Sequence, residues 1–431
     1  MSFPTGLKPC ICQSYPGPSR PWDEKVNLFF VFRMRKQLID RRRFIQSTLL
    51  SAAGLGLVHS GRLLPLLPDA IGAEFPVPRR YLGKTGVQIP ILQLGTSQSL
   101  DPVYDKILHR CYNGGVTALD TALSYGWGSS HRAIANFIQQ SGDRKKLWIT
   151  SKSGAWNADG LIKDVDKCLD QLQTDYLDLF LMHGINNTDY LNRDSIQAGE
   201  TLKRSGKIRF FGFSNHSGDI AALMQQAVKS GGIDAILFRY NFRTIGESRL
   251  NKAVDDCKNA GIGLIAMKTM GGVSDKEERV VKFQSQRFSL AQAKLKTVWE
   301  DDRIDAIVSE MQSVQEVREN IAAAKSSIAL TAREKQLLNE LAGKTGHLAC
   351  LGCSYLCEQA VVGDIAITDT LRFLMYDECY GKTELARQLF QNLPASKRYF
   401  GETDLSAAMQ VCPQRINIEE RLVMASTKLS V

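Results

Sequence analysis

The sequence predicts an α/β fold: a (β/α)8 TIM barrel followed by a small, mainly helical C-terminal domain that contains cysteines. From residue 90 onward, short runs rich in β-branched and aromatic residues alternate with longer helical patterns. Eight such runs follow one another at intervals of about 25 to 40 residues, the length of a strand and its following helix. The 431 residues leave room for a barrel of about 250 residues and a second, smaller domain.

The eight runs set the order of the predicted barrel strands. They cover residues 92–96, 118–122, 147–152, 177–183, 209–215, 234–241, 263–268 and 305–309. In such a barrel the active site lies at the carboxyl ends of the strands, so we look for chemistry in the polar side chain that closes each run. We expect an N-terminal extension with an export signal over residues 1–78, the barrel over 79–330 and the C-terminal module over 331–431.

The composition excludes several classes of protein. With 44% hydrophobic and 23% charged residues, the chain is neither disordered nor fibrous. The formal net charge is +9, but residues 1–78 contain 10 of the 54 Lys and Arg residues and only 5 of the 45 Asp and Glu residues. About half of the excess positive charge therefore belongs to the N-terminal extension, and we expect no nucleic-acid partner.

The N-terminal extension has the pattern of an export signal. Arg41, Arg42 and Arg43 precede the apolar residues 47–58, which are too few to span a bilayer as an ordinary helix. This pattern resembles a twin-arginine signal, which implies recognition by export machinery and a periplasmic or outward-facing, membrane-anchored protein. A basic amphipathic helix is the alternative, and the protein is cytoplasmic if the signal is not used.

Four titratable side chains follow the predicted strands: Asp120, Tyr125 five residues later, Lys152 and His183. Each one alone is more often a solvated rim residue than a catalytic group. Together they suit carbonyl reduction, because a tyrosine with a pKa near 10 exchanges its proton at neutral pH only beside a cation that stabilises its phenolate. Lys152 can supply this cation and Asp120 can keep it charged. His183 can hydrogen-bond the substrate oxygen.

Residues 79 to about 325 resemble the aldo-keto reductases. The resemblance rests on the segments VTALDTALSYG, TSK, LDLFLMHG and FGFSN. It implies reversible hydride transfer between a nicotinamide cofactor and a small carbonyl or alcohol substrate, with Tyr125 as general acid and the other three side chains in the roles just derived. The segment RYLGKTGVQIP resembles the hairpin that closes the barrel floor in this family.

The resemblance also implies where the cofactor binds. Ser214 and Asn215 match the pair that bonds the carboxamide, whereas Leu237 replaces the usual glutamine. Met267 stands where an aromatic residue often stacks on the nicotinamide. The remaining implied contacts are Gly95, Thr96 and Asn320.

The adenosine end of the cofactor site favours NADH over NADPH. The family places basic residues there for a 2′-phosphate, whereas this chain has Glu310 and Glu316. A carboxylate repels a phosphate and can accept a hydrogen bond from a free 2′-hydroxyl group.

The C-terminal module contains a second candidate site. Cys350, Cys353 and Cys357, with the remote Cys412, resemble a bacterial ferredoxin module. The gap between the second and third cysteines is one residue longer than usual, and residues 401–411 lack the cysteines of a second cluster. At most one four-ligand site is therefore expected. One [4Fe-4S] cluster, a tetrahedral zinc ion and a metal-free module all stay open.

Two hypotheses about function follow. The leading one is an NAD(P)-dependent oxidoreductase that acts on small carbonyl or alcohol substrates. If the module holds a cluster near the barrel mouth, we expect it to exchange electrons with a partner, since an exported enzyme meets no cytosolic pool of reduced nicotinamide. The alternative is a protein that retains a nicotinamide for redox sensing or docking and has a structural metal module. The complete set of four titratable residues favours the first hypothesis, and the altered carboxamide contacts favour the second.

Overall fold

The computed structural model describes residues 76–98, 100–142 and 144–430. All described residues belong to one compact unit. The export signal predicted at residues 41–58 lies outside the described residues, so it stays a prediction.

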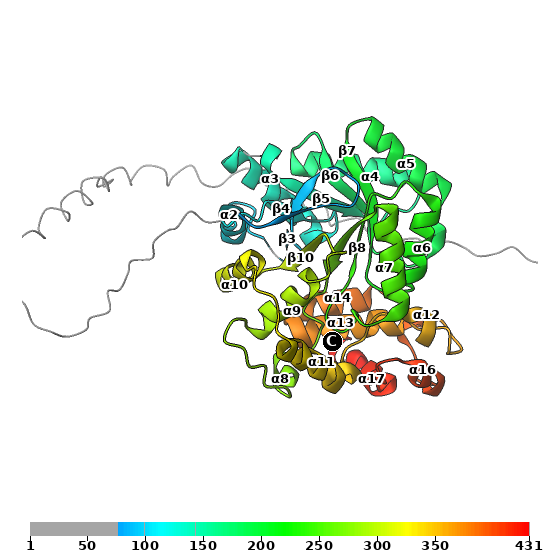
Figure 1. The fold of residues 1–431 in the computed structure, drawn as a ribbon. Helices are drawn as coiled ribbons and strands as arrows, with labels where there is room; N and C mark the ends of the chain where they lie inside the picture. Colours follow the sequence, from blue (N-terminus) through cyan, green and yellow to red (C-terminus); the bar gives the residue numbers. More distant parts are fainter. Residues whose placement is uncertain (1–75, 99, 143, 431) are drawn as a thin grey trace, which may run out of the picture. The chain divides into compact units, whose positions relative to one another are not determined.

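Eight parallel strands form a closed barrel, which confirms the predicted fold class (Figure 1). The strands are β3 (Leu92–Gly95), β4 (Ala118–Asp120), β5 (Trp148–Ser153), β6 (Leu177–Met182), β7 (Ile208–Asn215), β8 (Ala235–Arg239), β9 (Gly263–Met267) and β10 (Ala306–Glu310). Each strand pairs with the next along the chain, and β10 pairs with β3 to close the barrel. The carboxyl ends of all eight strands therefore surround one mouth.

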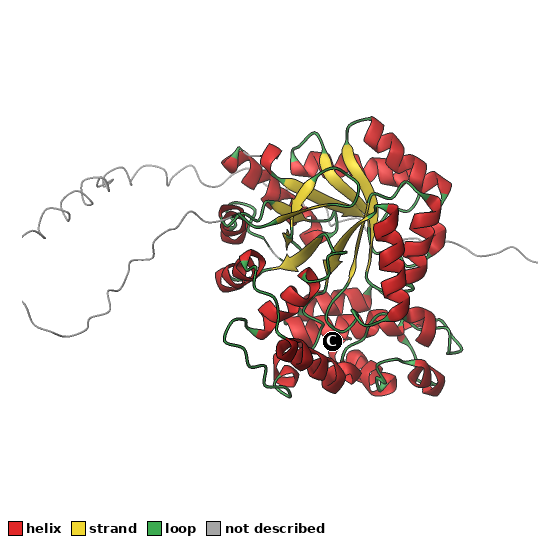
Figure 2. Cartoon of the chain, in the orientation of Figure 1, coloured by secondary structure: helices red, strands yellow, loops and turns green. Residues whose placement is uncertain are grey.

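Helices cover the outside of this barrel, as the red ribbons around the yellow strands show in Figure 2. They are α2 (Lys106–Asn113), α3 (Ser129–Ser141), α4 (Ala158–Leu172), α5 (Arg193–Arg204), α6 (Ile220–Ser230), α7 (Ser248–Ala260), α9 (Leu290–Trp299) and α10 (Val314–Lys325), with the 3-10 turns η1 (Tyr125–Gly128), η2 (Arg144–Lys146) and η3 (Thr188–Tyr190). Side-chain caps begin several of them: Asp105, Asn157 and Asn192 each accept from a backbone N–H of the first turn. The short helix α8 (Asp275–Glu278) follows β9 and contacts the C-terminal helices instead.

The hydrophobic core has two layers. One lies between the strands and the surrounding helices and includes the fully buried Cys111, Cys168 and Cys257, which pack as small apolar residues. The other fills the barrel interior and includes Leu82 and Ile89. These two residues belong to the antiparallel hairpin of β1 (Arg79–Tyr81) and β2 (Gln88–Pro90), which confirms the predicted hairpin and places it against the barrel interior.

The C-terminal module consists of short helices. They are α11 (Ala332–Thr345), η4 (Gly346–Leu348), α12 (Ser354–Cys357), α13 (Ile367–Tyr380), α14 (Thr383–Gln391), α15 (Ala395–Arg398), α16 (Ser406–Val411) and α17 (Ile418–Leu429). The module contacts the barrel at the carboxyl ends of its strands: Lys382 pairs with Glu310 at the end of β10, at 2.5 Å. In the part of the chain that the structure describes, no helix has both the length and the apolar character needed to cross a bilayer.

Candidate active site

The four predicted catalytic residues lie at the ends of three neighbouring strands. Asp120 is the last residue of β4, Lys152 lies near the end of β5, and His183 directly follows β6. Tyr125 begins η1, the turn that follows β4. Because β4 pairs with β5 and β5 with β6, the structure brings all four side chains to one part of the barrel mouth.

Lys152 is the centre of the group. Its buried ammonium contacts both carboxylate oxygens of Asp120, with Oδ2 at 2.5 Å, and donates to the carbonyl oxygen of Thr121 at 2.8 Å. It also lies 3.5 Å from the phenol oxygen of Tyr125. The ring of Tyr125 meets the imidazole of His183 edge to face, with 5.8 Å between centroids. A carbonyl oxygen placed between these two rings can therefore accept from both.

Burial governs the protonation of Tyr125. It raises the pKa of the phenol well above its usual value, and the negative charge of Asp120 raises it further. Although Lys152 lies close, its charge is balanced by Asp120, so the phenol keeps its proton. Tyr125 is protonated at neutral pH, the state that a general acid requires.

His183 is neutral under the same conditions. Burial lowers the pKa of its imidazole to about 3, and the positive charges of Lys152 and Arg372 contribute. A neutral imidazole keeps one N–H donor, which suits a hydrogen bond to a carbonyl oxygen without transfer of the proton.

The predicted nicotinamide contacts lie around the same mouth, but several already have partners in the chain. Ser214 accepts from the backbone N–H of Gly184 at 3.0 Å. The amide nitrogen of Asn215 donates to the carbonyl oxygens of Ile185 and Ser217, so both of its N–H groups are used. The carboxamide contact through Asn215 is therefore limited to its oxygen.

The remaining cofactor residues are also buried or engaged. Thr96 donates to the carbonyl oxygen of Asp120, and Asn320 donates to Ser309. Gly95 pairs with Asp120 across β3 and β4, and Met267 is buried at the end of β9. Gly95, Thr96 and Met267 lie at strand ends, and Asn320 reaches Ser309 of β10 from helix α10. These positions suit a nucleotide that crosses the mouth.

Glu310 does not stand free beside the mouth. Its carboxylate pairs with Lys382 at 2.5 Å and accepts from Ser97 and Gln312. Although burial opposes its ionisation, Lys382 and these donors lower the pKa of the carboxyl group. The preference for NADH therefore stays a prediction, because the charge that would repel a 2′-phosphate is already balanced by a lysine.

Helix α13 adds side chains that the sequence argument missed. The phenol oxygen of Tyr376 lies 3.2 Å from Nζ of Lys268 and 3.3 Å from Nη1 of Arg372. The sulfur of Met375 packs against Gly272, in the loop after β9. A nucleotide at this mouth must therefore share it with α13. The strand-end rule could have found Lys268, which follows β9, but nothing in the sequence places α13 there.

Three of the four predicted cysteine ligands gather around one small hydrophobic core. Cys357 is buried in it, and Cys350 and Cys412 pack against it. Burial raises the pKa of Cys353 to about 12, with contributions from Cys350 and Cys412. Across the described ranges, however, no group of three or more His, Cys, Asp or Glu side chains is arranged to hold a metal ion. The metal site predicted from the sequence therefore stays a prediction.

Comparison with known proteins relates the barrel to one family. The sequence model described as Aldo/keto reductase family matches residues 92–333, more than half of the chain. The chain is 24% identical over 279 residues to L-galactose dehydrogenase of Arabidopsis thaliana, covering 57% of this chain and 87% of that protein. It is 30% identical over 212 residues to glyoxal reductase of Bacillus subtilis (strain 168), covering 47% and 71%.

Among solved structures, the holo form of aldo-keto reductase AKR11C1 from Bacillus halodurans is similar with a TM-score of 0.53 and 21% sequence identity. The similarity covers 62% of this chain and 96% of that one. At this identity it shows that the fold is shared. Most of the C-terminal module lies beyond the end of the family match at residue 333.

Proposed function

The chain belongs to the Aldo/keto reductase family and is an oxidoreductase of that type, and from this premise we propose that it reduces small carbonyl compounds with Tyr125 as proton donor. The observation that supports this proposal is the contact of Lys152 with Asp120 and Tyr125 at the barrel mouth. Similarity to a glyoxal reductase supports a small aldehyde or ketone as substrate.

Each side chain has one task in this proposal. Tyr125 is protonated and donates its proton to the carbonyl oxygen as that oxygen gains negative charge. His183 is neutral and stabilises the same oxygen with a hydrogen bond. Lys152 lies close enough to stabilise the phenolate that remains, and Asp120 holds the ammonium in place.

A nicotinamide nucleotide is the cofactor that this chemistry requires. When bound in its reduced form, it would supply a hydride, with two electrons, to the carbonyl carbon. The cofactor would then be left oxidised. Ser214, Asn215 and Met267 would hold the nicotinamide end, and Glu310 and Asn320 the adenosine end. Gly95 and Thr96, at the end of β3, complete the proposed contacts.

Replacing Tyr125 with Phe tests the proposal. Turnover of glyoxal should fall by about 10² to 10⁴, because the proton donor is lost. Binding of the nucleotide, measured by fluorescence, should change little. Tyr81→Phe is the matched control, since Tyr81 is 58% exposed on β1. Full turnover in Tyr125→Phe would reject the role of Tyr125, and nucleotide binding without turnover in the native protein would favour the redox-sensing alternative.

The cysteine group supports a second, separate proposal. We propose one [4Fe-4S] cluster on Cys350, Cys353, Cys357 and Cys412, through which an electron-transfer partner would connect to the enzyme. This proposal rests on the spacing of the cysteines and on the gathering of Cys350, Cys357 and Cys412 around one core. Zinc and a metal-free core are the alternatives, and metal analysis separates the three.

A further inference from the structure

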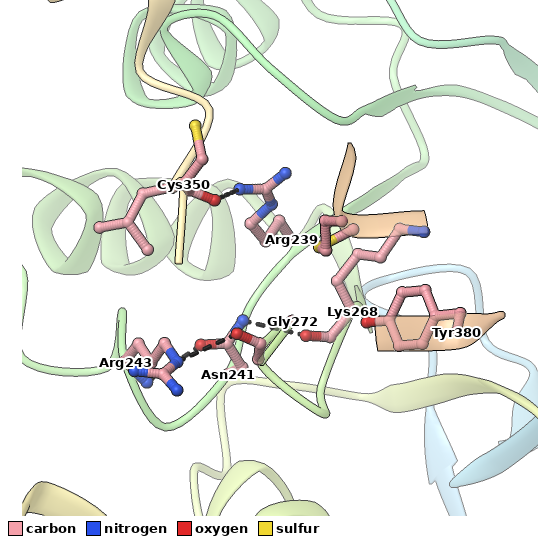
Figure 3. A pocket seen from close by; sticks show the side chains of 10 residues that line it. Arg239, Asn241, Arg243, Lys268, Gly272, Cys350 and Tyr380 are labelled. Atoms are coloured by element: carbon pink, nitrogen blue, oxygen red, sulfur yellow. Dashed lines mark hydrogen bonds between the residues drawn. The ribbon is translucent and has the colours of Figure 1, made fainter. Parts of the chain in front are cut away.

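Positive side chains converge beside the catalytic group from three elements. Arg239 ends β8, Lys268 follows β9, and Arg372 belongs to α13. Arg239 and Lys268 line one pocket, together with Tyr380 and the Gly271–Gly272 turn (Figure 3). With its opening to solvent included, the pocket has a volume of about 280 Å³. This space is too small for a whole dinucleotide.

The negative charge in contact with these cations is small. Arg372 pairs with Asp369 at 2.8 Å on its own helix. Arg239 donates to the carbonyl oxygen of Cys350 at 2.6 Å, and Lys268 donates to the phenol of Tyr376. Among the described residues, neither Arg239 nor Lys268 forms a salt bridge with a carboxylate. Three partly buried cations thus face one carboxylate, which leaves charge for an anion to neutralise.

Some polar atoms beside these cations also lack hydrogen-bond partners. Three buried nitrogens have no hydrogen-bond partner in the described structure: Nε of Arg239, Nε of Arg372 and Nδ1 of His216. A buried N–H group without a partner costs about 1 to 3 kcal/mol, so such groups indicate a missing acceptor.

His216, one of the groups with an unpaired nitrogen, lies next to the catalytic side chains. Its ring centroid lies 6.0 Å from that of His183, whose own ring faces Tyr125. Burial lowers the pKa of His216 well below its usual value, and the charges of Arg372, Lys268 and Arg239 contribute. All three positive charges therefore act on the imidazole of His216, which lies beside that of His183.

We propose that Arg239, Lys268 and Arg372 bind a carboxylate on the substrate itself, so that the preferred substrates are small 2-oxo acids and aldehyde acids. This inference rests on the proposed function. The carboxylate takes no part in the redox step: the neighbouring carbonyl carbon gains the hydride from reduced nicotinamide, its oxygen gains the proton of Tyr125, and the product is a hydroxy acid. The carboxylate must lie within a few bonds of the carbonyl group, because the cations lie beside the four catalytic side chains.

Glyoxal and glyoxylate form a matched pair for the test, because they differ only in an aldehyde replaced by a carboxylate. The native enzyme should have the higher kcat/KM for glyoxylate. Arg372→Met should lower kcat/KM for glyoxylate on the order of 10- to 100-fold, the loss expected for a charged hydrogen bond, with that for glyoxal changed less than about threefold. Arg387→Met on α14 is the control, because Arg387 pairs with Glu384 on its own helix. Lys268→Met is the second variant, should Arg372→Met fail to fold.

Oxalate binding, measured by calorimetry on the whole protein, provides a readout that needs no turnover. Binding that is lost in Lys268→Met supports the anion site even if no aldehyde is reduced, in which case only the proposed function fails. Turnover of glyoxal without oxalate binding, and without a preference for glyoxylate, would overturn the inference. A fall in nucleotide affinity in Arg372→Met with unchanged use of glyoxylate would also overturn it, because the cations would then bind cofactor phosphate.

Discussion

Lys268 and Tyr376 join the barrel to the C-terminal helices: Nζ of Lys268, after β9, lies 3.2 Å from the phenol oxygen of Tyr376 on α13. Burial opposes ionisation of this phenol, but the charges of Lys268 and Arg372 outweigh that effect and lower its pKa to about 7. Tyr125 and Tyr380 also face Tyr376, and neither adds positive charge. Tyr376 is therefore the group in the mouth whose charge changes near neutral pH.

Binding of carboxylate substrates should weaken as the pH rises through about 7. Below that pH Tyr376 is neutral and leaves the charges of Lys268 and Arg372 for the substrate, whereas above it the phenolate neutralises part of that charge. The KM for glyoxylate should therefore rise between pH 6 and 8, and the KM for glyoxal should not. Tyr376→Phe should remove this pH dependence. Tyr399→Phe, at an exposed position, should keep it. Equal pH profiles for the two substrates would contradict the role of Tyr376.

The pair of Lys152 and Asp120 should dominate the stability of the barrel mouth. Both side chains are nearly inaccessible to solvent, so Lys152→Met leaves the Asp120 carboxylate buried without its cation. We expect the free energy of unfolding to fall by about 3 to 5 kcal/mol. The double variant Lys152→Met, Asp120→Asn should recover most of this loss, because no charge stays buried. Urea unfolding measures both values. Equal stability of the single and double variants would show that the loss comes from packing.

The barrel could be predicted because its signal is local and repeated. Each strand is a short apolar run, and a polar residue closes it where the strands converge. That rule placed Asp120 and Lys152 together, and the structure joins them with a salt bridge. The same rule applies to Arg239 and Lys268. A single charged residue at a strand end is, however, most simply explained as a solvated rim residue until its neighbours are known.

The contribution of α13 could not be predicted, since it depends on contacts between residues far apart in the sequence. Arg372 and Tyr376 lie more than 100 residues after Lys268 along the chain, on a helix whose pattern looks like ordinary packing. The direction of the pKa shift at Tyr125 could not be predicted either, because burial outweighs the nearby lysine. Charge balance in a buried group depends on the whole surroundings and not on one neighbour.

The proposed cluster makes a prediction about metal content. Protein purified without oxygen should be brown and contain about four irons per chain. Cys412→Ala should lose iron and colour, while Cys379→Ala should keep them, because Cys379 lies on α13 outside the ligand set. Reduction of glyoxal with added reduced nicotinamide should persist in both variants. Stoichiometric zinc would favour a structural site, and protein free of both metals after anaerobic reconstitution would leave a metal-free core.

We also propose that the paired arginines direct export of the protein. If so, export depends on the arginine side chains themselves and not only on their positive charge. Changing Arg41 and Arg42 to Lys keeps both positive charges, so the electrostatics of the basic segment stay the same. A receptor that recognises the planar guanidinium with its five donors would no longer bind, since an ammonium cannot reproduce that geometry. Cell fractionation should therefore find the native protein exported and the double variant in the cytoplasm. Changing Arg33 and Arg35 to Lys is the matched control and should leave export intact. Equal export of all three proteins would reject recognition of the pair, and a basic amphipathic helix would then explain the segment.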